Sequence, residues 1–381
     1  MVKTVLFDVD GVFLSEERYF DASALTVWEL LNSKNYLGLN PETFKTTYRN
    51  DEIEQIRKTV FVDDQVLNFM KSRGLNANWD MIYIAFSYQL IHLLEQVKDQ
   101  YSEQITKWFS QDINYGTLNE IREALKDQSV SLDFTVFLDD YKQTNATKQG
   151  LVDYLNTLTE QKLGVDTSIF KKKSALWSVG EHASQEWYVG DKNILQSTGR
   201  PSVQTGKAGF LSEEDTLAEP EVIAELFNFL NQEGIKVGIG TGRPRLETHE
   251  PFTYLKWLDH LDTNHIVTAD DVAETEKASG SDHSLSKPHP YTYLQAYYGK
   301  DHPYDAFITD PKPLENGKDV LVVGDSLADL LAARQIGCQF AAVLTGLSGQ
   351  AARGEFEEHG ADYILDSVVD VKKLISQLVE K

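Results

Sequence analysis

Thr4-Val5-Leu6-Phe7-Asp8-Val9-Asp10-Gly11 decides the fold, because a β-branched and aromatic run ends directly at two carboxylates. The run predicts a buried strand, and open α/β sheets bind their ligands at the carboxyl ends of the strands. In an extended segment residues i and i+2 point to the same side, so Asp8 and Asp10 can face one pocket, while Gly11 lets the chain turn away. Two close carboxylates suit a metal ion. Asp-x-Asp also occurs in solvated turns, so the other motifs of the chain have to distinguish a metal site from a simple turn.

Length and composition limit the class of protein. A chain of 381 residues exceeds the roughly 250–300 residues of a single core, so two domains are expected. The net charge of −23 disfavours nucleic acid and anionic membranes as partners, and leaves small phosphorylated metabolites open. The single cysteine, Cys338, predicts a buried thiol. With no signal-peptide pattern and no run of about 20 apolar residues, a cytoplasmic location is expected.

The apolar runs predict a parallel, doubly wound sheet. Between most of these runs lie helical patterns, such as the one over Glu219–Glu233, and this alternation is typical of an α/β fold. The strand-like runs are Thr4–Phe7, Lys236–Ile239, His265–Thr268, Val320–Val323, Phe340–Leu344 and Tyr363–Leu365.

More than 200 residues separate the first two predicted strands, which is too long for a simple connection. We therefore expect residues 1–14 and 206–381 to form a Rossmann-like core, and residues 15–205 to form an inserted, mainly α-helical domain. Two shorter segments, Val189-Gly190-Asp191 and the acidic stretch Asp270–Asp282, are expected to be loops.

Three further polar clusters follow the first one. Gly240-Thr241-Gly242-Arg243 comes directly after a predicted strand, where the Thr241 hydroxyl and the backbone N–H groups around Gly242 can cradle an anion; a simple turn capped by Thr241 is the alternative. Lys287 precedes a predicted helix start, although a single lysine is usually on the surface. Asp325 ends the strand Val320–Val323 and Asp329 follows four residues later, so both could reach one metal ion or could simply cap a helix.

In this order the four clusters resemble the haloacid dehalogenase (HAD) superfamily of phosphotransferases. The resemblance covers about residues 1–14 and 206–381, and the insertion falls where that family places its helical cap. It implies that Asp8 is the nucleophile that attacks phosphorus and that Asp10 acts as acid and base. Thr241, Gly242 and Lys287 would hold the phosphoryl oxygens.

The resemblance also implies a Mg²⁺ site made by the Asp8 carboxylate, the Asp10 backbone carbonyl and Asp325, with Asp329 in support. Such an all-oxygen site suits Mg²⁺, and phosphoryl transfer needs an in-line nucleophile, a clamp on the phosphoryl oxygens and a cation. Asp10 disfavours carbon–halogen cleavage, in which no leaving group needs a proton. A Mg²⁺-dependent phosphatase acting on a small phosphomonoester is favoured. A phosphosugar mutase with the same core, and a non-catalytic binding or regulatory protein of the same fold, stay open. The sequence leaves the oligomeric state and the substrate undetermined.

Overall fold

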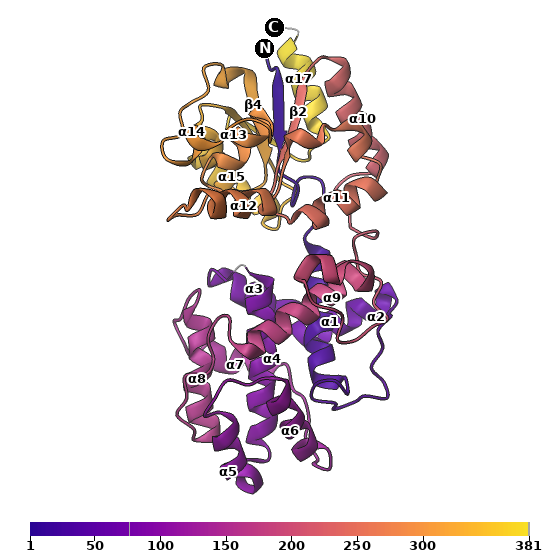
Figure 1. Cartoon of the computed structure of the whole chain (residues 1–381), viewed down its shortest axis with the longest axis vertical. Coiled ribbons are helices and arrows are strands. Elements are labelled where there is room, and N and C mark those ends of the chain that lie inside the picture. Colours follow the sequence, from indigo (N-terminus) through magenta and orange to yellow (C-terminus); the bar gives the residue numbers. More distant parts are fainter. Residues whose placement is uncertain (76, 380–381) are drawn as a thin grey trace. The chain divides into compact units, whose positions relative to one another are not determined.

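The computed structural model describes residues 1–75 and 77–379, which divide into two compact units (Figure 1). The core unit comprises Met1–Glu16 and Leu211–Lys381, and the inserted unit comprises Glu17–Phe210. Among the described helices, none combines the length and apolarity needed to cross a membrane.

A six-stranded parallel sheet organises the core unit, with the strand order β3-β2-β1-β4-β5-β6. The predicted α/β class is confirmed, and every predicted strand-like run contains a strand. The bounds are β1 Thr4–Phe7, β2 Lys236–Gly240, β3 Ile266–Val267, β4 Val320–Gly324, β5 Gln339–Val343 and β6 Tyr363–Leu365.

Alternate residues of each strand enter two apolar layers, one on each face of the sheet. On β1, Val5 and Phe7 pack into a layer with α10 (Pro220–Gln232) and α17 (Asp370–Val379), whereas Leu6 enters the opposite layer with α13 (Tyr291–Tyr298) and α15 (Leu327–Gln335). Each fully buried side chain of this size stabilises the fold by about 1.5–3 kcal/mol. Cys338 is buried in the second layer, as predicted.

The core helices lie between successive strands, except α17, which follows β6. Their bounds are α10 Pro220–Gln232, α11 Arg245–Tyr254, α12 Ala269–Ser279, α13 Tyr291–Tyr298, α14 Asp305–Ile308, α15 Leu327–Gln335, α16 Arg353–Glu358 and α17 Asp370–Val379, with short 3-10 turns at Leu258–His260, Thr263–His265, Gly317–Asp319 and Gly349–Ala352.

The strand register brings the polar clusters to one edge. Phe7 at the end of β1 lies opposite Ile239 of β2 and Val323 of β4. Because all three strands are parallel, the residues that follow them leave the sheet at the same carboxyl edge, which is where this fold class binds ligands.

The inserted unit is helical throughout its regular structure. Helix α4 is buried along most of its length and packs against α1, α8 and α9, which explains why its sequence is apolar on all sides. The bounds are α1 Glu17–Asn32, α2 Asn50–Phe61, α3 Gln65–Ser72, α4 Asn78–Glu95, α5 Lys98–Trp108, α6 Tyr115–Leu125, α7 Val136–Tyr141, α8 Gly150–Leu163 and α9 Ala175–Thr198.

Two predicted loops are helical, and both predictions were wrong for a local reason. The acidic stretch forms α12, because Thr268 and Asp271 make a reciprocal capping box and Val272 supplies a buried face. Val189-Gly190-Asp191 lies within α9, at a kink where Gly190 has a φ of 75°. A Cβ there would meet the Ala208 carbonyl oxygen at 2.3 Å, so glycine allows a close approach of two backbone segments.

Candidate active site

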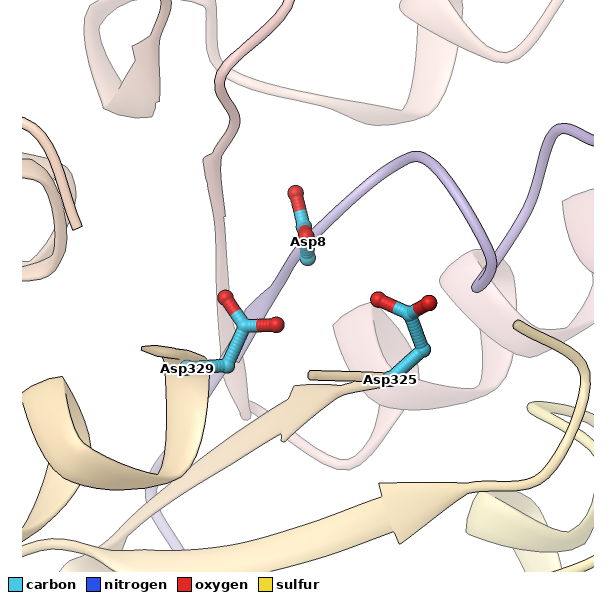
Figure 2. A group of neighbouring side chains, drawn as sticks. All are labelled: Asp8, Asp325 and Asp329. Atoms are coloured by element: carbon cyan, nitrogen blue, oxygen red, sulfur yellow. The ribbon is translucent and has the colours of Figure 1, made fainter. Parts of the chain in front are cut away.

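Three carboxylates meet at the carboxyl edge of the sheet. Asp8 directly follows β1, Asp325 directly follows β4, and Asp329 lies in the first turn of α15; Figure 2 shows the elements from which they come. One oxygen from each lies within 4.8 Å of the others. Oxygen ligands at this spacing suit a hard divalent cation such as Mg²⁺.

Two glycines fix Asp325. A Cβ on Gly11 would lie 2.2 Å from Asp325 Oδ2, and a Cβ on Gly346 would lie 2.1 Å from the same atom. The Thr345 hydroxyl donates a hydrogen bond of 2.6 Å to the Gly11 carbonyl, which ties the loop after β5 to the loop after β1. Asp325 is therefore held between two backbone segments that only glycine allows to come this near.

Lys287 joins Asp8 to Asp329. Its Nζ lies 2.9 Å from Asp8 Oδ2 and 2.6 Å from Asp329 Oδ1, and it also donates to the Gly240 carbonyl at 3.3 Å. Burial disfavours the ammonium, but Asp329 and Asp8 raise the pKa of Lys287 above its ordinary value. Lys287 is therefore a fixed positive charge beside Asp8.

Three residues, Lys287, Tyr293 and Ser326, donate to the Asp329 carboxylate. Besides Lys287, the Tyr293 hydroxyl donates to its Oδ1 at 2.7 Å and the Ser326 hydroxyl donates to its Oδ2 at 2.6 Å. Burial alone would raise the pKa of Asp329, but Lys287 and these hydrogen bonds hold that pKa below its ordinary range. Its geometry suits the positioning of Lys287 and the capping of α15.

The other two carboxylates carry raised pKa values. Burial raises the pKa of Asp8 to about 7, with Lys287 opposing and Asp329 reinforcing the shift. Burial, followed by repulsion from Asp8 and Asp329, raises the pKa of Asp325 to about 9. A cation bound between them would relieve the repulsion and favour both charged forms.

Asp10 lies at the same pocket but faces a different partner. Its Oδ1 lies 2.8 Å from Nε of Arg243, a side chain that is only 1% exposed. Burial raises the pKa of Asp10 to about 7, while Arg243 lowers it and three nearby glutamates raise it. The Asp10 carboxylate is absent from the group of three carboxylates around Asp325, so the structure places it apart from them.

The loop after β2 completes the site. Gly242 and Lys287 line a pocket of about 550 Å³ together with Asp8, Asp10 and Asp325. Thr241 is buried, and its hydroxyl accepts the Arg243 N–H at 3.1 Å, so it shapes the turn. The Thr241 N–H donates to the Val267 carbonyl at 3.0 Å, so this N–H is engaged in the sheet.

Sequence reasoning missed four residues of the site. Tyr293 and Gly346 lie outside the sequence motifs, at separations from them that no general sequence pattern predicts. Arg243 and Glu214 are far apart in the sequence, and only folding brings them together as an ion pair. One signal was present: Gly346 lies just after a predicted strand, at the same sheet edge as the acidic motifs.

Known proteins match different portions of the chain. Residues 284–371 match the family model described as HAD-hydrolase-like. Pyrophosphatase PpaX of Bacillus cereus is 27% identical over 165 residues, which cover 43% of this chain and 63% of that protein. PpaX of Bacillus thuringiensis is 28% identical over 165 residues, which again cover 43% of this chain and 63% of that protein. The chain thus matches less than two thirds of the length of these curated relatives.

One solved structure matches the whole chain. A crystal structure from the Northeast Structural Genomics Consortium has a TM-score of 0.92 and 37% identity, over 100% of both chains. Its match includes the inserted helices as well as the core. The motif order, the parallel sheet, the family match and this full-length relative agree, and the chain belongs to the HAD-like hydrolase superfamily.

Proposed function

We propose that the chain is a Mg²⁺-dependent phosphatase that hydrolyses a small phosphomonoester through an aspartyl phosphate on Asp8. One observation carries the proposal: Asp8 lines the pocket with Lys287 at 2.9 Å and the half-buried Asp325 close by. A carboxylate nucleophile needs a fixed cation and a metal nearby, because an anionic phosphate would otherwise repel it.

The residues present fit Mg²⁺. Asp8, Asp325 and the Asp10 carbonyl would hold the ion, and Asp329 would support the site through Lys287. The raised pKa of Asp325, about 9, reflects buried negative charge that a divalent cation would offset. When bound, Mg²⁺ would supply positive charge to the phosphoryl oxygens during transfer.

The chain's own residues perform the steps. An Asp8 oxygen attacks phosphorus in line, and the bond between phosphorus and the ester oxygen breaks. Asp10 gives its proton to the departing oxygen, and Lys287 and the loop at Thr241 and Gly242 hold the phosphoryl oxygens. Water then attacks the phosphorus of the aspartyl phosphate. Asp10 takes a proton from that water, phosphate leaves and Asp8 is restored.

The inserted unit, Glu17–Phe210, is proposed to act as the cap that selects the substrate. The substrate would be a small phosphorylated metabolite in the cytoplasm. The pyrophosphatase name of the Bacillus relatives makes inorganic pyrophosphate one candidate to test.

The test is phosphate release from p-nitrophenyl phosphate, pyrophosphate and a panel of phosphorylated metabolites, with Mg²⁺ and with EDTA. Wild-type protein should release phosphate only with Mg²⁺, and Asp8→Asn should release none while keeping its fold. Asp282→Asn, a change at an exposed aspartate outside the pocket, serves as the matched control and should keep full activity. Transfer of phosphate between sugar hydroxyls without release would favour a mutase. Binding without any turnover would favour a regulatory protein.

A further inference from the structure

Arg243 is a buried arginine that the proposed reaction does not yet use. Its guanidinium reaches three parts of the core unit: Nε lies 2.8 Å from Asp10 Oδ1, Nη2 lies 2.8 Å from Glu214 Oε1, and Nη1 donates to the Glu247 carbonyl at 2.9 Å. The side chains of Arg243 and Glu214 are both 1% exposed. A planar guanidinium with several donors can hold such partners in fixed directions at once.

Asp10 is only partly enclosed by this arrangement. Its side chain is 27% exposed and lines the pocket, while Oδ1 is turned towards Arg243. With one oxygen held by the arginine, Oδ2 is the oxygen left to exchange a proton with a bound ester. The contact is an ion pair without hydrogen-bond geometry, but Asp10 has a short aliphatic stem, so drawing Oδ1 towards Arg243 limits where Oδ2 can lie.

Glu214 links the same arginine to the segment that returns from the inserted unit. That segment pairs with the one that leaves the core: Ser15 N–H donates to the Asp215 carbonyl at 2.8 Å, and Leu217 N–H donates to the Phe13 carbonyl at 2.9 Å. Asp10 and Arg243 therefore lie beside a backbone pairing within the core unit, in which Leu14 pairs with Asp10 and with Thr216.

We infer that Arg243 is a positioning residue for proton transfer, which aims Asp10 at the leaving-group oxygen and is itself held by Glu214. This inference rests on the proposed phosphatase function and goes beyond it, since that function assigns no role to Arg243. A lysine at position 243 would keep the positive charge, but it has a single ammonium donor group instead of the several N–H donors of a planar guanidinium.

The dependence of kcat/KM on the leaving group distinguishes a role in proton transfer from a purely structural role. An ester of a good leaving group, such as p-nitrophenyl phosphate, needs little help from an acid, whereas an alkyl phosphate depends on it. The value of kcat/KM reports the steps up to departure of the leaving group, so later hydrolysis of the aspartyl phosphate does not obscure it. We therefore compare kcat/KM over a series of substituted phenyl and benzyl phosphates, for the wild type and for Arg243→Lys.

In Arg243→Lys, kcat/KM for the benzyl esters should fall at least about 10-fold more than kcat/KM for p-nitrophenyl phosphate, because acid catalysis contributes about 10²–10⁴-fold. Arg245→Lys is the matched control, since Arg245 is 40% exposed and pairs with Asp271 and Glu274 outside the pocket. For Arg245→Lys, the dependence of kcat/KM on the leaving group should equal that of the wild type. Arg243→Gln, checked by thermal melting, repeats the test if the lysine variant does not fold.

A double-mutant comparison decides whether the effect acts through Asp10. In an Asp10→Asn background, Arg243→Lys should cause little further loss for the benzyl esters, because the acid is already absent. An equal loss for all esters, or a full additional loss in the Asp10→Asn background, would overturn the inference while leaving the phosphatase proposal intact. Absence of turnover in the wild type with every ester would overturn both.

Discussion

The ammonium group of Lys287, whose side chain is 11% exposed, lies 2.9 Å from the carboxylate of the buried Asp8 at the carboxyl edge of the sheet. This contact sets a positive charge where an incoming phosphate would meet the proposed nucleophile. Lys287 is held in turn by Asp329 at 2.6 Å, so the position of the cation depends on residues that lie behind it.

Tyr293→Phe tests that dependence. The variant removes the hydroxyl that donates to Asp329 at 2.7 Å, and should lower kcat about 10-fold as Lys287 loses its fixed position. The free energy of unfolding should fall by about 1–3 kcal/mol, because Asp329 loses a buried hydrogen bond. Steady-state kinetics and chemical denaturation measure the two effects. Tyr254→Phe, at a tyrosine that is 64% exposed, should change neither; unchanged kinetics in Tyr293→Phe would refute the positioning role.

Gly346→Ala tests the metal site without touching a ligand. The new Cβ would lie 2.1 Å from Asp325 Oδ2 and 2.9 Å from Asp325 Cβ, so the whole Asp325 side chain has to move. Mg²⁺ affinity, measured by calorimetry, should fall about 10- to 100-fold, as it does when groups that orient metal ligands are changed. Gly354→Ala is the control, since a Cβ there meets nothing within 4 Å. Equal affinities in the two variants would show that Asp325 is not a ligand.

Stability without metal should fall as the pH rises. The pKa of Asp8 is about 7 and that of Asp325 about 9 in the folded protein, against an ordinary value of 3.8 for an aspartate. Between these values the folded state binds more protons than the unfolded state, so the free energy of unfolding decreases with rising pH up to about 9. Mg²⁺ requires the carboxylates, so its affinity should rise over the same range.

Thermal melting with Mg²⁺ and with EDTA, at about pH 6 and about pH 8.5, checks this expectation. The increase in melting temperature caused by Mg²⁺ should be larger at the higher pH. The same increase at both pH values, or a larger one at the lower pH, would contradict the assignment of these carboxylates to the metal.

The strands were predictable because each one leaves a local signal. The runs that end at Asp8, Gly240 and Asp325 are apolar and β-branched, and a parallel register brings their ends to one edge without further information. The inserted domain stays a prediction, which rests on a separation between the first two strands that no ordinary connection spans.

Contacts between segments that are far apart in the sequence have no such local sequence signal. The pairing of Arg243 with Glu214, and the closeness of Gly346 to Asp325, join residues that only the folded chain brings together. Helix α12 differs for another reason: its acidic sequence is typical of a solvated loop, but Thr268 and Asp271 form a capping box that begins a helix there.

The most direct measurement is whether a phosphoryl group becomes attached to Asp8 during turnover. Wild-type protein turning over p-nitrophenyl phosphate with Mg²⁺ is quenched in acid and analysed by intact mass and peptide mapping. We expect one phosphoryl group on the peptide that contains Asp8, and none in Asp8→Asn or with EDTA. Turnover that continues in Asp8→Asn, or a phosphoryl group on a different residue, would contradict it.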